Sequence, residues 1–315
     1  MGSSPGTGSP REAKSRAVTD ATSVRVAAPA KVNLFLRILA KEESGYHQLE
    51  TLYAAVDLCD EILLHRTERG VSIEVVGPSV GPDEENLAYR AAGALLEAAG
   101  SPAGVHVHLT KNIPVGAGLG GGSSNAGATL RALNTLLGEP CSPATLLQIA
   151  GGLGADVPFF ASGAGTALAW GRGERLMPIP RAPHLSLLLA LPSVQIATGE
   201  AYERLANPKN ITPTTLVLSA LCRPETLAEL AVNDFEVSVF DRHPELGKLR
   251  EALNAAGALT ARLSGSGAAL FGLFHDRAAA QHARASLSTS WTEVRFVVTE
   301  TLASQPEPTS VSVNP

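Results

Sequence analysis

Cysteine is scarce in this chain of 315 residues, which has three, Cys59, Cys141 and Cys222, far apart and without a Cys-x-x-Cys pair. An odd and scattered set argues against a disulfide framework and against a cysteine-based metal site. This pattern fits a reducing compartment, so the sequence indicates a cytoplasmic protein. Aromatic residues are also few, at 4%, and leucine, valine and alanine must therefore supply most of the core.

An excess of basic charge is lacking too, because 25 Lys and Arg stand against 30 Asp and Glu, for a net charge of −5. Nucleic-acid binding needs a broad basic face, so no nucleic-acid partner is expected. No apolar run reaches the roughly 18 residues of a membrane span, and the N-terminus lacks the apolar core of a signal peptide. We expect no membrane partner. The negative net charge is still compatible with a small anionic substrate, since a few amides and cations suffice to bind one.

Both ends of the chain have the composition of disordered tails. Residues 1–22 and residues 304–315 are rich in small, polar and proline residues. The rest is long enough for two domains, and four prolines between positions 178 and 192 punctuate its middle. We therefore expect an N-terminal domain over residues 23–182 and a C-terminal domain over residues 183–303.

Strand and helix patterns interleave between these tails without a strict βαβ order, which indicates an α+β fold. Strands are expected at 24–28 and 32–39, separated by Pro29, and at 61–65, 71–76, 105–110, 185–191, 268–274 and 292–299. Helices are expected at 86–99, 126–137, 143–151, 227–232, 244–256 and 277–287.

The most informative segment runs from Pro114 to Ala126 and reads Pro-Val-Gly-Ala-Gly-Leu-Gly-Gly-Gly-Ser-Ser-Asn-Ala. It lies between an expected strand and an expected amphipathic helix. Glycine lets the backbone approach a ligand closely, and the unpaired amides at a helix start suit a phosphate. The segment therefore predicts a phosphate-binding loop, with a flexible surface loop as the alternative.

The surroundings of this glycine loop exclude several familiar phosphate loops. Residues 116–121 match the dinucleotide pattern Gly-x-Gly-x-x-Gly, but no second strand ending in an acidic residue follows the helix. A Walker A loop needs Gly-Lys-Ser or Gly-Lys-Thr, and neither occurs. The companion motifs of protein kinases are absent as well.

Three further motifs stand in order around the glycine loop. They are Ala28-Pro-Ala-Lys-Val-Asn-Leu-Phe-Leu36 with Gly45-Tyr-His47 after it, Leu153-Gly-Ala-Asp-Val-Pro158, and Arg262-Leu-Ser-Gly-Ser-Gly-Ala268. Together with the loop, their order and spacing across residues 24–300 resemble the GHMP kinases, the superfamily of galactokinase, homoserine kinase and mevalonate kinase. The resemblance implies a two-domain fold with an N-terminal ATP-binding domain, a ferredoxin-like C-terminal domain and an active site between them.

Within that superfamily, Gly45-Tyr-His47 and the triple glycine are similar to members whose acceptor carries a cytidyl diphosphate. The resemblance implies that ATP, assisted by Mg²⁺, phosphorylates the 2-hydroxyl of 4-diphosphocytidyl-2-C-methyl-D-erythritol in the non-mevalonate route to isoprenoid precursors. This small molecule would be the partner of a monomer or a weak homodimer. A kinase for another acceptor, such as homoserine, and a non-catalytic ligand-binding relative are the alternatives.

The resemblance also implies roles for three polar residues. Asp156 would take the acceptor proton, and Lys31 would pair with it, favour the ionised carboxylate and stabilise charge on the transferred group. Asp156 also precedes Val-Pro-Phe-Phe, so it can cap a helix, and a capping position would fix the carboxylate. Asn33, on the same strand face as Lys31, would contact the substrate.

The remaining implied contacts form an acceptor group and a nucleotide group. In the acceptor group, Tyr46 would stack on cytosine, His47 would hydrogen-bond its edge, Thr198 would contact the substrate and Tyr202 would be a second ring against cytosine. Gly265 would belong to a second backbone nest near the active site. Thr198 departs from the usual pattern, because Ala197 and Gly199 flank it. The nucleotide group consists of Asn86, Lys111, Pro114, Gly116, Gly118, Gly120, Gly121, Gly122, Ser123 and Ser124. Ser124 would also touch Mg²⁺; for Asn86 a helix start, for Lys111 a surface position and for Gly265 a plain tight turn are the alternatives.

Overall fold

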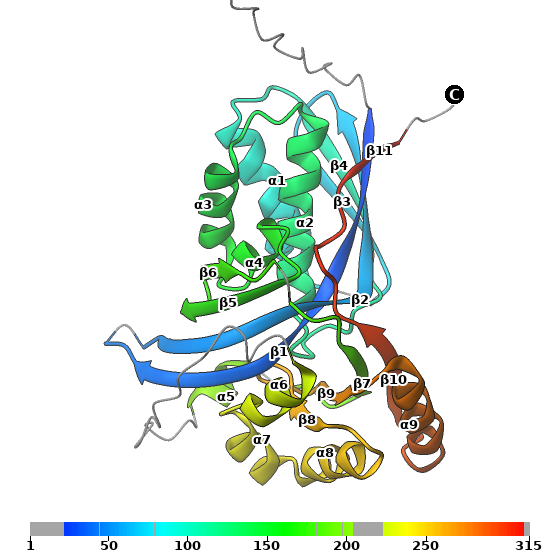
Figure 1. The fold of residues 1–315 in the computed structure, drawn as a ribbon. Coiled ribbons are helices and arrows are strands. Elements are labelled where there is room, and N and C mark those ends of the chain that lie inside the picture. Colours follow the sequence, from blue (N-terminus) through cyan, green and yellow to red (C-terminus); the bar gives the residue numbers. More distant parts are fainter. Residues whose placement is uncertain are drawn as a thin grey trace, which may run out of the picture.

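The computed structural model of the chain describes residues 22–43, 45–78, 80–180, 182–196, 198–203 and 223–311. Within these residues two β-sheets lie one above the other (Figure 1). The larger sheet has seven described strands, in the order β11-β1-β2-β4-β3, with β5 paired to β2 and β6 paired to β5. They are β1 (Ser23–Lys41), β2 (His47–Thr67), β3 (Val71–Val76), β4 (Gly104–Thr110), β5 (Thr166–Gly171), β6 (Arg175–Pro178) and β11 (Thr309–Val311).

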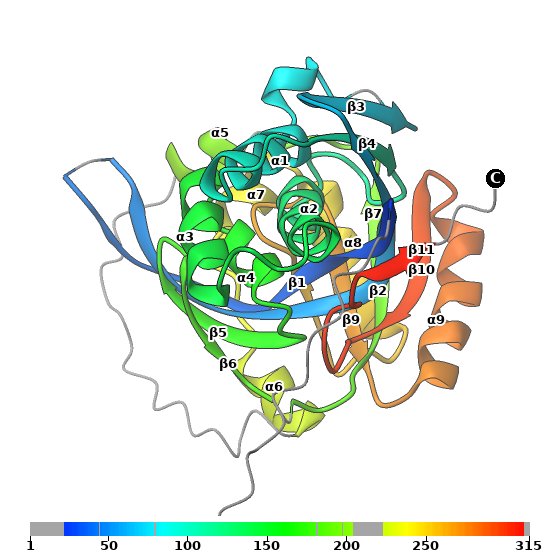
Figure 2. The same cartoon turned by 90° about the horizontal axis from the view of Figure 1, so that it is seen from above.

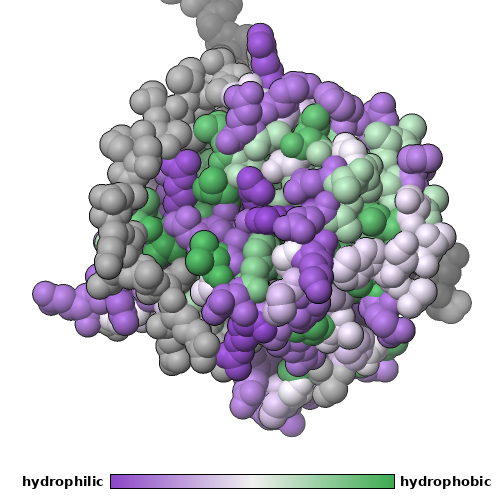
Figure 3. Space-filling model, turned by 90° about the horizontal axis from the view of Figure 1, so that it is seen from below, coloured by the Kyte–Doolittle hydropathy of each residue, from purple (hydrophilic) through white to green (hydrophobic). Residues whose placement is uncertain are grey.

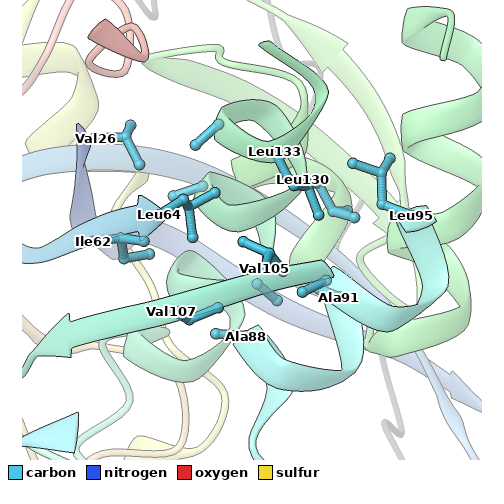
Figure 4. Packing of buried hydrophobic residues seen from close by; sticks show 14 of the residues in the cluster. Val26, Ile62, Leu64, Ala88, Ala91, Leu95, Val105, Val107, Leu130 and Leu133 are labelled. Atoms are coloured by element: carbon cyan, nitrogen blue, oxygen red, sulfur yellow. The ribbon is translucent and has the colours of Figure 1, made fainter. Parts of the chain in front are cut away.

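Helices of the first half cover one side of the larger sheet and enclose its core. They are α1 (Leu87–Ala98), α2 (Gly121–Leu136), α3 (Pro143–Leu153) and α4 (Val157–Ala161), and the 3-10 turn η1 (Asp83–Glu85) precedes them. Figure 4 shows how α1 and α2 place Leu95, Leu130 and Leu133 toward strand residues such as Leu64 and Val105. These positions follow the periods of 3.6 and 2 that the sequence displays. Packing in this core holds α2 in place, and α2 starts at the glycine loop.

The smaller sheet has four described strands in the order β10-β7-β9-β8. They are β7 (Ser186–Pro192), β8 (Thr260–Leu263), β9 (Leu270–Phe274) and β10 (Val294–Glu300); the helices are α5 (Thr198–Glu203), α6 (Pro224–Leu230), α7 (Glu236–Arg242), α8 (Pro244–Ala255) and α9 (Arg277–Ser290). In the view from above, α9 lies beside β10 and apart from α1–α4 (Figure 2). The chain order β7, helices, β8, β9, α9, β10 gives the expected ferredoxin-like connectivity, and the α+β class is confirmed.

Pro29 does not separate two strands as expected, because residues on both sides of it belong to the single strand β1. A register shift between Pro29 and Ala30 interrupts the pairing with β2 at this point. On the other edge of β1, β11 pairs only with residues 23–25. A proline without an N–H is tolerated where the ladder is already interrupted, and so β1 continues.

The prediction of a disordered tail over residues 304–315 was wrong for its described part, which ends at Val311. Thr309–Val311 forms β11 and pairs with β1, Ser23 lying opposite Val311. The side chain of Gln305 is buried and donates to the carbonyls of Phe159 and Ala164. The polar side chain of Gln305 thus supplies hydrogen-bond donors to backbone carbonyl groups of the first half of the chain. Residues 1–21 and 312–315 of the expected tails lie outside the described residues.

The two sheets divide the chain between Pro178 and Ser186, apart from β11. The domain limits at residues 182 and 303 remain a prediction. On the face seen from below, hydrophobic residues lie in separate patches among hydrophilic ones, which is ordinary for a protein surface (Figure 3). In the described part of the chain, every helix is too short or too polar to cross a membrane.

Candidate active site

A cavity of about 1200 Å³ lies where the four sequence motifs meet. Its walls include Lys31, Tyr46, Gly118, Asp156 and Gly265, which come from all four motifs. Pockets for one small molecule usually measure about 300–1,000 Å³. The space is therefore large enough for a nucleotide and a second substrate together.

The glycine loop enters its helix earlier than the sequence suggests, since α2 begins at Gly121 and not near Ala126. Its N-cap is Gly120, at φ 70° and ψ 20°, and makes no side-chain capping bond. The first-turn N–H groups of a helix have no intrahelical partner, so here they are left for a ligand in the cavity. A Cβ at Gly120 would lie 3.1 Å from Lys31 Cε and 3.2 Å from the Phe160 ring. Glycine at this position therefore lets Lys31 reach the loop.

The third motif packs directly on the glycine loop. A Cβ at Gly118 would lie 2.1 Å from the carbonyl oxygen of Ser264. The Ser264 hydroxyl donates to the Gly118 carbonyl at 3.0 Å, and the Ala269 amide donates to Ala117 at 3.1 Å. Gly265, at φ 55°, lines the cavity beside this contact. The two motifs thus form one continuous backbone wall.

Lys31 is 4% exposed and its ammonium group is held at the cavity wall. Nζ donates to Asn33 Oδ1 at 2.6 Å and to the Gly118 carbonyl at 3.1 Å, and it lies 3.6 Å from Asp156 Oδ2. Burial lowers the pKa of Lys31, and the charge of Asp156 opposes this effect. Asn33 Nδ2 donates to Thr51 at 2.8 Å. Both polar atoms of Asn33 therefore contact protein groups, and because Asn33 also lines the cavity, its contact with the substrate remains a prediction.

Asp156 stands at the N-cap position of α4, with Pro158 in the first turn, but its side chain makes no capping hydrogen bond. The expectation that capping fixes the carboxylate was wrong. Tyr53 does so, because its hydroxyl donates to Asp156 Oδ1 at 2.8 Å while Lys31 faces Oδ2. Burial and the neighbouring carboxylate raise the pKa of Tyr53 well above its usual value, so the phenol remains a donor.

Tyr53 was missed by sequence reasoning because it belongs to none of the motifs. It lies in β2 directly opposite Asn33. Its place is also restricted by Gly173, where a Cβ would lie 2.6 Å from the Tyr53 hydroxyl. A tyrosine within an otherwise apolar strand segment was the available signal, but only strand register shows what it faces.

The aromatic residues of the acceptor group gather at one end of the cavity. The His47 ring stacks on Tyr202 with centroids 5.0 Å apart, and Tyr202 meets Phe235 edge-on at 4.9 Å. Tyr46 is 59% exposed. Burial, followed by the charge of Lys41, lowers the pKa of His47, which favours a neutral ring that can both donate and accept. Thr198 is the first residue of α5, whereas Ala197 lies outside the described residues.

We call the part of the cavity wall formed by the nucleotide group the nucleotide end, and two of its members hold local structure. Asn86 caps α1, since its Oδ1 accepts from the Ala88 amide at 2.9 Å, and it also lines the cavity. The surface alternative for Lys111 was wrong, because this residue is buried. Its Nζ donates to Asp60 and, at 3.0 Å, to Asn125 Oδ1.

Asp60 is a further residue that the motifs did not reveal. It is fully buried, and its Oδ1 accepts from the backbone amides of Asn112 at 2.7 Å and Ile113 at 2.8 Å. Its Oδ2 accepts from Asn125 Nδ2 at 2.8 Å and pairs with Lys111. The hydrogen bonds of this one carboxylate therefore link β2 to the residues after β4 and to α2.

The structure does not bring Ser124 to the cavity as expected. Its buried hydroxyl donates to the Pro29 carbonyl at 2.6 Å, so it joins α2 to β1, whereas Ser123 lines the cavity. In the described residues no three His, Cys, Asp or Glu side chains are grouped to hold a metal. Asp156 and Glu174 line the cavity, and Mg²⁺ often takes one or two carboxylates and otherwise phosphates and water. The donor set suits a Mg²⁺ that enters with a nucleotide.

Comparison with known proteins gives matches over most of the chain. The family model described as GHMP kinases N terminal domain matches residues 86–164, and that described as GHMP kinases C terminal matches residues 217–293. A 4-diphosphocytidyl-2-C-methyl-D-erythritol kinase of Geobacter metallireducens is 40% identical over 85% of this chain and 95% of its own. One of the same name from Salinibacter ruber is 42% identical over 82% of this chain and 93% of its own.

Solved structures agree with these sequence matches. A crystal structure of 4-(cytidine 5′-diphospho)-2C-methyl-D-erythritol kinase superposes with a TM-score of 0.76 at 38% identity, covering 88% of this chain and 99% of that one. Homoserine kinase from Cytophaga hutchinsonii gives a TM-score of 0.70 at 22% identity, covering 93% and 98%. The second similarity concerns the fold alone.

Proposed function

The chain belongs to the GHMP kinases and, within them, to the 4-diphosphocytidyl-2-C-methyl-D-erythritol kinases, and on that premise we propose that it phosphorylates the 2-hydroxyl of 4-diphosphocytidyl-2-C-methyl-D-erythritol with ATP. The reaction would be a step of isoprenoid precursor synthesis in the cytoplasm. One observation carries the proposal: the pair of Lys31 and Asp156 stands on the cavity wall between the glycine loop and the aromatic end.

Asp156 is the general base in this proposal. The acceptor 2-hydroxyl gives its proton to the Asp156 carboxylate while its oxygen forms a bond to the γ-phosphorus and the bond to the ADP oxygen breaks. Tyr53 holds Oδ1 of this carboxylate at 2.8 Å, so Oδ2, on the side of Lys31, is the better placed oxygen for the proton. The ammonium group of Lys31 stabilises negative charge on the transferred group.

The triphosphate is held by the glycine loop and the start of α2. Uncapped first-turn amides and the positive end of the helix dipole supply the attraction, and Gly116, Gly118 and Gly120 all have positive φ angles that turn the loop around a ligand. Mg²⁺ would be held by phosphate oxygens together with the Ser123 hydroxyl or the Asp156 carboxylate. When bound, it supplies charge neutralisation for the phosphates.

The acceptor's cytosine is recognised at the aromatic end. Tyr46 offers an exposed ring for stacking, and neutral His47 offers a donor and an acceptor to the base edge. The ring centroids of His47 and Tyr202 are 5.0 Å apart. Two aromatic rings in direct contact have centroids about 4.5–7 Å apart, so no third ring fits between these two. The base therefore approaches the open side of Tyr46.

Phosphorus NMR tests the proposal directly. Purified full chain, MgATP and the cytidyl substrate should give ADP and one new phosphomonoester signal, and the Asp156→Asn variant should give neither. Parallel reactions with homoserine and mevalonate test other acceptors of the superfamily. Turnover of either, with none of the cytidyl substrate, would overturn the proposed acceptor.

A further inference from the structure

Two hairpin turns stand side by side at the acceptor end of the cavity. One joins β1 to β2 around Tyr46, and the other joins β5 to β6 at Arg172. Because β2 pairs with β5, with Leu49 opposite Gly171, the turns point in the same direction (Figure 1). Gly171 and Gly173 have φ angles of 75° and 115°, so the second turn is tight and holds Arg172 close to its strand.

The side chain of Arg172 connects these turns. Its guanidinium carbon lies 4.0 Å from the centroid of the Tyr46 ring, and its Nη2 donates to Glu42 Oε2 at 2.5 Å. The backbone amide of Arg172 donates to Glu174 Oε2 at 2.7 Å. A planar guanidinium stacks on an aromatic face and forms a directed bond to a carboxylate at the same time, which an ammonium group cannot do.

The contact between Arg172 and Tyr46 determines which face of the Tyr46 ring is open. Arg172 covers one face of this ring, although the ring is 59% exposed overall. Of the other rings nearby, Tyr202 stacks on His47 and meets Phe235 edge-on. The uncovered face of Tyr46 is an aromatic surface that a planar base can reach.

We propose that Arg172 is a specificity-determining positioning residue, which holds Tyr46 so that one ring face is presented to the pyrimidine of the acceptor. This inference rests on the proposed function. Glu42 keeps the guanidinium in place, and the ring is ordered before the substrate arrives. Preorganisation of this kind improves affinity because less conformational freedom is lost on binding.

Arg172→Lys and Arg172→Gln provide the first test. Both should raise the KM for the cytidyl substrate by about three- to tenfold, with kcat and the KM for ATP changing less than about twofold. Arg175→Gln is the matched control, because Arg175 is 68% exposed on β6 and outside the cavity. If lysine restores the wild-type KM, positive charge alone is sufficient and the inference is overturned.

A double-mutant cycle separates positioning from direct contact. In a Tyr46→Leu background, Arg172→Gln should cause no further rise in the KM for the cytidyl substrate, because the ring it holds is gone. Independent and additive effects would mean that Arg172 binds the substrate itself, for example at its diphosphate, and would overturn the inference. Arg172 is 42% exposed, so all variants should keep the wild-type melting temperature.

Calorimetric titration with cytidine 5′-diphosphate distinguishes failure of this inference from failure of the proposed function. Wild-type protein that binds the nucleotide with the same dependence on Arg172, but phosphorylates nothing, would refute only the proposed reaction. An active wild type whose Arg172 variants bind the nucleotide unchanged would refute only the inference. A wild type that neither binds it nor turns over substrate would overturn both.

Discussion

The two ends of the cavity are built from different materials. The nucleotide end presents glycine backbone amides at the start of α2, beside a buried side-chain network of Asp60, Lys111 and Asn125. The acceptor end consists of side chains, with Tyr46, which is 59% exposed, before β2, His47 at the start of β2 and Tyr202 on α5. In the proposed function, backbone amides bind the phosphate donor, whereas exposed rings contact the acceptor and can be exchanged without disturbing the core. The difference explains how one fold can keep its phosphate donor and change its acceptor.

Asp156→Asn should have the largest effect on turnover and should leave both ends intact. Loss of the general base should lower kcat by roughly 10²–10⁴, while ATP and the cytidyl substrate still bind. Rapid-quench kinetics together with calorimetry of each ligand would measure this. Turnover close to wild type would remove Asp156 from its proposed role, and lost binding of either ligand would show that chemistry and binding are not separable here.

Asp60→Asn tests the rigidity of the nucleotide end. The variant leaves the buried ammonium group of Lys111 without its counter-charge, and breaking a buried ion pair costs about 3–5 kcal/mol of unfolding free energy. Denaturant titration measures this loss. The double variant Asp60→Asn with Lys111→Met should recover part of it, since no charge is then left unpaired. An equally unstable double variant would contradict the ion-pair explanation.

Gly118→Ala compares the tolerance of the two ends to a single added methyl group. At Gly118 a Cβ would lie 2.1 Å from the Ser264 carbonyl and φ is +77°, so we expect a loss of about 1–3 kcal/mol and a higher KM for ATP. Gly199→Ala at the acceptor end is the control, because a Cβ placed there meets nothing within 4 Å among the described residues. Equal effects of the two substitutions on thermal unfolding would contradict the contrast between the ends.

The smallest effect concerns pH and the acceptor end alone. Burial and Lys41 lower the pKa of His47, so the ring stays neutral from high pH down to below the ordinary value of about 6.5 and becomes charged only at more acidic pH. The KM for the cytidyl substrate should therefore be constant through neutral pH and rise only below it, while the KM for ATP does not follow. The His47→Gln variant should lose this dependence. A rise already between pH 7 and 8 would be inconsistent with a lowered pKa.

Much of the site could be predicted because its motifs are local in sequence. The glycine loop and the turn around Gly265 have positive φ angles that only a few residue types allow, and the motif around Lys31 has the pattern of a strand. Their meeting at one cavity was expected from the family resemblance, and Lys31 and Asp156, at opposite ends of a long stretch of sequence, do lie 3.6 Å apart.

The residues that sequence reasoning missed act through strand register and not through a motif. Tyr53 faces Asp156 because β2 pairs with β1 in one alignment, and Arg172 reaches Tyr46 because β5 pairs with β2. A shift of one residue would send either side chain to the opposite face. Local sequence does not specify such alignments. The early start of α2 at Gly121 was missed for a different reason, since glycine has a low helix propensity that tertiary contacts override here.

The return of residues 303–311 to the first sheet has a consequence for synthesis on the ribosome. Gln305 donates to the Phe159 carbonyl in the helix that follows Asp156, and β11 pairs with the start of β1. Translation adds these residues after the whole ferredoxin-like half. A nascent chain can therefore form most of its N-terminal half early, but α4 and the edge of β1 obtain their last partners only when the segment beyond Ala303 has left the exit tunnel.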